Sequence, residues 1–290
     1  MRRMTNEELF LFDLQGYLLI EDVLSPNDVA AANEAVDRHA HLIQHRKAGL
    51  AHTSRRLFGP KGKGGFVQNP LSFESPWCEP FRKMLAHPRV VDIFNEILGA
   101  GFRLDHGPAL LEMDQGVEGH WLHGGMTFDP SRYHRYEHGR ICCGLCVASW
   151  QLTEIRDADG GFMCIPGSHK LNYRAPDRVL SAEDDRGLIK HLTMRSGSLL
   201  IFNEALLHGT LPWAAPDRVR RAVLFKYSPG FLSWGKPHER CPISQPTAEE
   251  LALYEPTYRS GRPVLGEGKE DRAAIHAHPQ PVDVNRNHED

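Results

Sequence analysis

Residues 197–210 read GSLLIFNEALLHGT, a short apolar run that a glycine precedes and a histidine follows. From residue 101 onward the chain repeats this pattern, in which apolar runs rich in Val, Ile, Leu, Phe and Cys are separated by turns rich in Gly, Pro and Asp. The apolar runs are at 102–113, 140–152, 161–165, 197–203 and 221–228. This alternation is typical of an all-β sandwich or barrel, whereas βαβ units would place a helical pattern between the strands. We therefore predict a β-core.

Helical signals dominate the first hundred residues. Residues 7–14 predict a short helix that ends near Gly16, and residues 17–20 then read as a strand. Ser25 is followed by a proline and, three residues on, by an acid, which is a strong signal for a capped helix start. Residues 88–98 predict another helix that ends at a glycine. Residues 47–75 are rich in Gly, Pro and Lys and predict a loop able to cover a pocket.

The length of 290 residues accommodates one full-sized domain. We expect a single domain over residues 1–264, with a late helix near 247–254. Its parts would be a helical N-terminal layer (1–100), a β-core (101–230) and a C-terminal extension (231–264). Residues 265–290 are polar and carry Pro, Asp, Asn and His, which predicts a mobile tail.

Composition excludes several classes of partner. The formal net charge is −3 and 24% of residues are charged, so no basic field would attract nucleic acid or an anionic membrane. No apolar run approaches the ~20 residues of a membrane span, and no apolar segment follows the charged first residues as in a secretory signal. We expect a cytoplasmic protein whose partner is a small-molecule substrate, and we infer no protein partner.

A CxxC pattern occurs at Cys143 and Cys146. Such a spacing raises the possibility of a redox or zinc pair. The surrounding segment, residues 140–152, reads as one buried strand, in which residues three apart point to opposite faces. This interpretation makes the cysteines small buried thiols that share neither a metal nor a disulfide.

Four segments of the β-region carry the residues that could perform chemistry. The 17 histidines make any single histidine motif weak, but the order of the four segments is informative: GHWLHGG (119–125), DGGFMCIPGSHK (159–170), GSLLIFNEALLHGT (197–210) and RRAVLFKY (220–227). Together they resemble the phytanoyl-CoA dioxygenase (PhyH-like) family of Fe(II)/2-oxoglutarate-dependent oxygenases. The resemblance covers roughly residues 10–230, and its most specific parts are IPGSHK and the HGT–Arg pair.

The resemblance implies a double-stranded β-helix, the jelly-roll or cupin-like fold, with iron at one open end and 2-oxoglutarate and O2 as cosubstrates. It implies that His123 and His208 bind the metal. Arg220 would hold the C5 carboxylate of 2-oxoglutarate with a planar two-donor contact that lysine cannot reproduce, and the Thr210 hydroxyl would assist. Strand alternation sends only one of Arg220 and Arg221 inward, and the family pattern favours Arg220.

Two further histidines belong to these segments. His120 is three residues from His123, so it would lie on the opposite face of a regular strand. His169 falls in a turn in the resembling family, and we interpret it as structural.

One departure from the family bears on the chemistry. Where the family has His-x-Asp, this chain has His123, Gly124 and Gly125, so the carboxylate ligand is missing. Some related enzymes with Ala or Gly at this position are halogenases that bind chloride or bromide there. Gly125 would therefore mark a halide site in an enzyme that attacks an unactivated C–H bond.

Two alternatives stay open. The first is a hydroxylase with an atypical iron site, which uses water or recruits another acid, for which Asp129 and Asp159 are the nearest candidates in the sequence. The second is a non-catalytic jelly roll that binds a small molecule. A pair of glycines is also typical of a bulge or of a close backbone approach.

Overall fold

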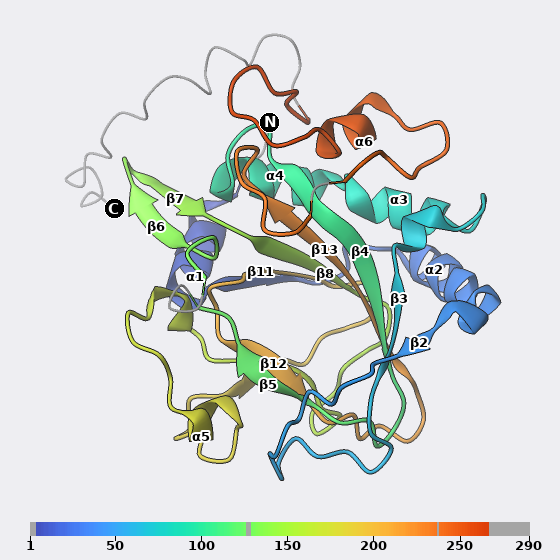
Figure 1. Ribbon diagram of the computed structural model, residues 1–290, viewed down its shortest axis with the longest axis vertical. Helices are drawn as coiled ribbons and strands as arrows, with labels where there is room; N and C mark the ends of the chain where they lie inside the picture. Colours follow the sequence, from blue (N-terminus) through green and yellow to red (C-terminus); the bar gives the residue numbers. More distant parts are fainter. Residues whose placement is uncertain (1–3, 126–128, 237, 267–290) are drawn as a thin grey trace, which may run out of the picture.

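The computed structural model describes residues 4–125, 129–236 and 238–266. Two antiparallel sheets form its centre and lie one above the other in Figure 1. The larger sheet has seven strands in the order β1 (Tyr17–Ile20), β11 (Leu199–Asn203), β8 (Cys146–Gln151), β13 (Arg220–Ser228), β4 (Arg103–Met113), β3 (Gly65–Gln68) and β2 (Gln44–His45). The smaller has β10 (Lys190–His191), β9 (Gly161–Cys164), β12 (His208–Leu211) and β5 (His120–His123). The predicted double-stranded β-helix is confirmed.

The four predicted helices begin within one residue of their expected positions, and two further helices, over residues 79–85 and 177–180, were not predicted. The helices are α1 (Asn6–Gln15), α2 (Pro26–Arg38), α3 (Glu79–Leu85), α4 (Pro88–Ile97), α5 (Asp177–Leu180) and α6 (Ala248–Leu253), with 3-10 turns at 40–42, 70–72 and 168–170. Reciprocal capping boxes open α1, α2 and α6, formed by Thr5 with Glu8, Ser25 with Asp28 and Thr247 with Glu250. Such caps satisfy backbone N–H groups that the first turn leaves without partners, and each contributes about 1 kcal/mol.

Alternating side chains of the larger sheet serve two different cores. On β11, Leu199 and Ile201 pack with the helices α2, α3 and α4, whereas Leu200 and Phe202 pack between the two sheets with Phe162 of β9. The period of two in a strand produces this division. The helices therefore close one face of the larger sheet and leave its other face for the space between the sheets.

The first hundred residues are less purely helical than expected. They supply β1, which was predicted at residues 17–20, and also β2 and β3, which were not; β1 pairs with β11 and β3 pairs with β4. The segment 47–75, predicted to be loop, contains β3 and a 3-10 turn. These strands are short, so their apolar periodicity is weak and the partner strands decide their conformation.

The prediction for the CxxC segment was wrong. The chain does not form one strand over 140–152: β7 (Arg140–Cys143), which pairs with β6 (His134–Glu137), ends before a bend at Gly144, and β8 begins at Cys146. The bend brings the two thiols into contact instead of sending them to opposite faces. Both are free, as predicted, and fully buried.

Within the described ranges, no helix combines the length and the apolar character that crossing a bilayer requires. The predicted mobile tail lies outside the described residues from position 267 onward.

Candidate active site

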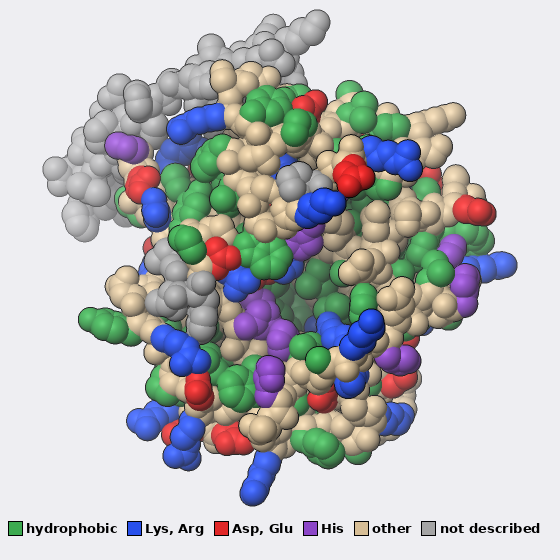
Figure 2. All heavy atoms as spheres, in the orientation of Figure 1, with side chains coloured by type: hydrophobic (Ala, Val, Ile, Leu, Met, Phe, Trp, Pro, Cys, Tyr) green, Lys and Arg blue, Asp and Glu red, His purple; other side chains and the backbone are tan. Residues whose placement is uncertain are grey.

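A cavity of about 520 Å³ lies between the two sheets. Figure 2 shows its hollow near the centre of one face, beside histidine side chains. Strands of both sheets line it, together with segments from the N-terminal region and from the chain after β13. The lining includes Arg46, Gln68, His106, His120, His123, Ser149, Glu204, His208, Thr210, Arg220, Lys226 and Trp234.

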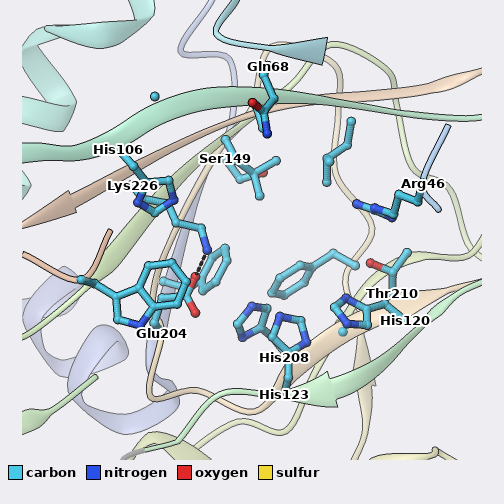
Figure 3. A pocket seen from close by; sticks show the side chains of 18 of the residues that line it. Arg46, Gln68, His106, His120, His123, Ser149, Glu204, His208, Thr210 and Lys226 are labelled. Carbon is cyan, nitrogen blue, oxygen red and sulfur yellow. Dashed lines mark ion pairs between the residues drawn. The ribbon is translucent and has the colours of Figure 1, made fainter. Parts of the chain in front are cut away.

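His123 and His208 lie opposite each other on adjacent strands. Antiparallel pairing of β5 with β12 places the two residues in register, and their ring centroids are 4.2 Å apart (Figure 3). The Nδ1 atom of His123 is 3.0 Å from the Trp121 carbonyl oxygen, and that of His208 is 2.8 Å from the Leu206 oxygen. Because a carbonyl only accepts, each Nδ1 carries the proton, which leaves the Nε2 lone pair of both rings for a ligand such as a metal ion.

Burial keeps both imidazoles neutral. It lowers the pKa of His123, and burial together with the neighbouring His123 lowers the pKa of His208 to about 3. Neutral imidazole is the form that binds a metal. The pair is therefore in its metal-binding form at physiological pH.

His120 contradicts the expectation from strand alternation. It pairs with Thr210 while His123 pairs with His208, so β5 advances by three residues where β12 advances by two. This bulge restores His120 to the face of His123, and the two rings stack with centroids 4.1 Å apart. Burial and the two neighbouring histidines lower the pKa of His120 to about 2. Across the described ranges, however, no three His, Cys, Asp or Glu side chains are grouped closely enough to hold an ion.

The two arginines at the start of β13 point in opposite directions. Arg221 pairs with Glu112 and Asp37 on the outer side. Arg220 lines the cavity, is 4% exposed, and places Nη1 3.0 Å from the Met113 sulfur, while its Nε has no hydrogen-bond partner. Burial and Arg46 lower the pKa of Arg220 to about 10. A buried guanidinium without an acid is costly, so this position favours an anionic ligand.

Arg46 is a second cation at the same end of the cavity. It follows β2, lines the cavity with Thr210, and points inward in Figure 3. Its guanidinium forms no ion pair in the part of the chain that the structure describes. Sequence reasoning did not find Arg46, because a lone arginine between a helix and a loop carries no motif.

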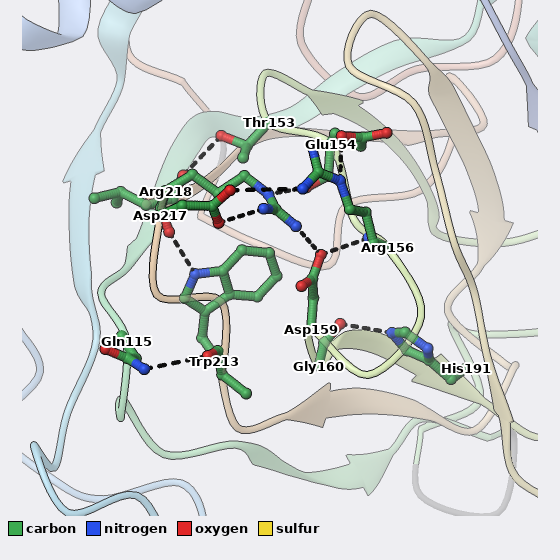
Figure 4. Close-up of polar contacts among 12 residues, drawn as sticks. Gln115, Thr153, Glu154, Arg156, Asp159, Gly160, His191, Trp213, Asp217 and Arg218 are labelled. Atoms are coloured by element: carbon green, nitrogen blue, oxygen red, sulfur yellow. Dashed lines mark hydrogen bonds and ion pairs between the residues drawn. The ribbon is translucent and has the colours of Figure 1, made fainter.

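Neither acid nominated from the sequence lines the cavity. Asp159 accepts a hydrogen bond from the Arg156 amide and pairs with Arg218 (Figure 4). Asp129 accepts from Ser131 and from the Trp234 indole.

The acid that does line the cavity is Glu204. It is 1% exposed, and its Oε1 is 2.7 Å from Lys226 Nζ. In the sequence, its position four residues before His208 is the signal that points to it.

Gly124 and Gly125 mark a close backbone approach. Their φ angles are +113° and +95°, a region that favours glycine. A Cβ on Gly124 would lie 2.3 Å from the Leu206 oxygen and 2.7 Å from the Glu204 oxygen. The Gly125 N–H donates to the Glu204 oxygen at 3.2 Å. Backbone geometry alone thus accounts for both glycines.

Known proteins resemble this chain in sequence and in fold. The family model for phytanoyl-CoA dioxygenase (PhyH) matches residues 12–222. Ectoine dioxygenase of Streptomyces coelicolor is 25% identical over 227 residues, which cover 70% of this chain and 71% of the relative. Dioxygenase swnH1 of Metarhizium robertsii is 24% identical over 266 residues, 86% of this chain and 79% of the relative.

A solved structure shares the fold. HygX from Streptomyces hygroscopicus, with nickel, 2-oxoglutarate and hygromycin B bound, superposes with a TM-score of 0.65 at 22% identity, covering 90% of this chain and 98% of HygX. The family match spans well over half of the chain and includes His123, His208 and Arg220. The chain belongs to the phytanoyl-CoA dioxygenase family.

Proposed function

We propose that this protein is an Fe(II)/2-oxoglutarate-dependent oxygenase that oxidises a C–H bond of a small organic molecule. The observation that carries the proposal is the close approach of the His123 and His208 imidazoles, whose Nδ1 atoms are bonded to carbonyls, in the same cavity as the Arg220 guanidinium, whose Nε has no hydrogen-bond partner. His123 and His208 would hold the iron. Arg220 and the Thr210 hydroxyl would hold the distal carboxylate of 2-oxoglutarate.

The residues fit these groups chemically. Two neutral imidazoles are donors that iron(II) accepts, and they leave coordination positions free. The unsatisfied Nε of Arg220 fits a carboxylate, which a guanidinium can bind through two donors. Iron(II) bound there with 2-oxoglutarate and O2 would supply the oxidising power, while burial keeps the two imidazoles neutral.

The substrate would occupy the side of the cavity away from Arg220. In Figure 3 the Glu204–Lys226 pair lies on one side of His123 and His208, and Arg46 and Thr210 lie on the other. A cavity of about 520 Å³ holds 2-oxoglutarate together with a small molecule. The relatives named for ectoine, and HygX with hygromycin B bound, support a small-molecule substrate.

Halogenation is the second candidate, and Gly125 is the observation that favours it. With no side chain at the position of the family carboxylate, chloride or bromide could bind iron there. The positive φ of Gly125 supplies a competing reason for glycine. It also makes Gly125→Asp a poor test, because an aspartate there would strain the backbone by about 1–3 kcal/mol.

The test is anaerobic titration of the reduced protein with Fe(II) and 2-oxoglutarate, followed by the metal-to-ligand charge-transfer absorption, in chloride and in sulfate at matched ionic strength. An oxygenase gives the band in both salts, and turnover with the true substrate gives a hydroxylated product without halide. A halogenase requires halide for its product. Absence of the band, with His208→Ala as the matched blank, would favour the non-catalytic alternative.

A further inference from the structure

Glu204 is hydrogen-bonded through its main chain to Gly125, the position at which the family has a carboxylate. The Gly125 N–H donates to the Glu204 carbonyl oxygen at 3.2 Å, and Gly125 is two residues beyond His123. Glu204 is also four residues before His208. The residue whose main chain is bonded to Gly125 is therefore an acid, and it lies close in the sequence to His208.

The side chain of Glu204 lines the same cavity as the two histidines. Its Oε1 is 2.7 Å from Lys226 Nζ, yet that buried oxygen accepts no well-aligned hydrogen bond. Burial alone would raise the pKa of Glu204, but Lys226, His208 and His123 hold it below its ordinary value, so the group is a carboxylate. A buried anionic oxygen with incomplete partners is an available ligand.

A purely structural ion pair looks different in this molecule. Glu250, which is 4% exposed, receives Arg82 Nε on one oxygen at 2.7 Å and Arg82 Nη2 on the other at 2.8 Å. Both of its oxygens are satisfied, and no catalytic group is near. Glu204 has one cation, on one oxygen, at the wall of a cavity.

We propose that Glu204 supplies the carboxylate ligand that the His-Gly-Gly segment lacks. This inference rests on the proposed iron site of His123 and His208. Because the described residues contain no ready group of three donors, the carboxylate must turn from Lys226 toward the imidazoles when the metal arrives. The step exchanges one cation, the Lys226 ammonium, for another, the metal, and transfers neither a proton nor an electron.

The assignment has a consequence for the reaction. If His123, His208 and Glu204 all held the iron and 2-oxoglutarate bound beside them, the metal would have room for O2 but not for a halide as well. Glu204 as a ligand favours oxygen transfer over halogen transfer.

Metal affinity tests the proposal without turnover. Co(II) is titrated anaerobically into the wild-type protein, Glu204→Gln, Lys226→Met and the control Glu250→Gln, and the visible d–d absorption is followed. We expect Glu204→Gln to weaken binding by roughly 100-fold, Lys226→Met to leave it equal or tighter because the competing cation is gone, and Glu250→Gln to match wild type. Equal losses in Glu204→Gln and Lys226→Met would show a structural pair and overturn the proposal, as would wild-type affinity in Glu204→Gln.

A second measurement compares the response of the metal complex to halide. Chloride is added to the wild-type Co(II) complex, with sulfate as the ionic-strength control. We expect chloride to change the d–d spectrum more in Glu204→Ala than in wild type, because loss of the carboxylate opens one further position on the metal. An equal chloride response in the two proteins would overturn the proposal and leave room for halogenation. If wild type binds no Co(II), or if His208→Ala binds it as tightly as wild type, the proposed iron site itself is contradicted, independently of Glu204.

Discussion

Two arginines that are only two residues apart, Arg218 and Arg220, lie in opposite electrostatic surroundings. Arg218 belongs to a network in which it pairs with Asp159 and Asp217 and donates to the Glu154 carbonyl, as Figure 4 shows. Its own carbonyl accepts the Trp213 indole N–H at 2.8 Å. Arg220 enters the cavity, where no acid pairs with it among the residues that the structure describes, and its Nε stays without a partner.

The difference is between a charge that has its acidic partners within the protein, as Arg218 does, and a charge that would need a bound anion as its partner, as Arg220 does. Around Asp159 the ionic groups have opposite charges within reach, which is what a buried charge requires when nothing else will bind. In the cavity, Arg46 and Arg220 repel each other, so a bound anion would stabilise both. Arginines thus occupy two different electrostatic environments in this protein, and burial alone would not distinguish them.

The largest expected effect concerns the two imidazoles. His208→Ala removes one of the two facing Nε2 donors, and we expect it to abolish stoichiometric binding of Fe(II) or Co(II). His191, whose Nε2 is 2.6 Å from the Gly160 carbonyl beside Asp159, is the matched control, and His191→Ala should bind metal like wild type. Isothermal titration under anaerobic conditions measures both. Equal losses of metal affinity in His208→Ala and His191→Ala would contradict the assignment of metal binding to the cavity.

Next in size is the contrast between Arg220→Ala and Arg218→Ala. Loss of a two-donor contact to a carboxylate costs about 3 kcal/mol, so Arg220→Ala should raise the dissociation constant of 2-oxoglutarate by roughly 100-fold. Since it removes a buried charge without a partner, it should leave the Tm of the ligand-free protein equal or higher. Arg218→Ala should do the reverse, lowering the Tm while 2-oxoglutarate binds normally. Calorimetry of each variant with and without 2-oxoglutarate decides the matter.

Arg46→Ala should have an intermediate effect. Arg46 lines the cavity but is less enclosed than Arg220, so we expect roughly a tenfold loss of 2-oxoglutarate affinity, or about 1.4 kcal/mol. The loss should shrink at high salt more than that of Arg220→Ala, because the more exposed charge is better screened. A salt series of 2-oxoglutarate titrations measures this, and an affinity independent of Arg46 would restrict the anion site to Arg220.

The smallest effect belongs to Thr210→Val, which removes one neutral hydroxyl from the cavity and retains the shape. We expect about 1 kcal/mol, or a fivefold weaker 2-oxoglutarate affinity, with unchanged metal binding. Thr153→Val is the control, because the Thr153 hydroxyl bonds the Val219 carbonyl in the network of Figure 4. A larger effect at Thr153 than at Thr210 would contradict the assignment of this hydroxyl to the cosubstrate.

Local signals in the sequence predicted much of the fold. The proline after Ser25 and the acid at Asp28 located the start of α2, and the apolar runs located β4, β9, β11 and β13. These features depend on a few adjacent residues, so a single sequence contains them. The order of the four motif segments also indicated correctly that His123 and His208 come together.

Features that depend on tertiary structure were missed or predicted wrongly. The bulge in β5 that turns His120 inward, and the bend at Gly144 that joins the two thiols, each shift alternation by one residue without a composition signal. Arg46 reaches the cavity from a segment without a motif, and Glu204, although it is in the same motif segment as His208, is far from His123 in the sequence, so spacing to His123 carries no information. The nominated Asp129 and Asp159 are near His123 in the sequence or the motif order, but their side chains are engaged elsewhere.

Gly124 has a mechanical consequence. With its Cβ position within 2.7 Å of the carbonyl oxygens of Leu206 and Glu204, it locks the end of β5 against the segment that leads into β12. The two histidines are thus fixed relative to each other by a main-chain contact beside them, before any metal binds. Even a methyl group at position 124 would force the two segments apart. The proposed metal site would then lose its geometry although both imidazoles were still present.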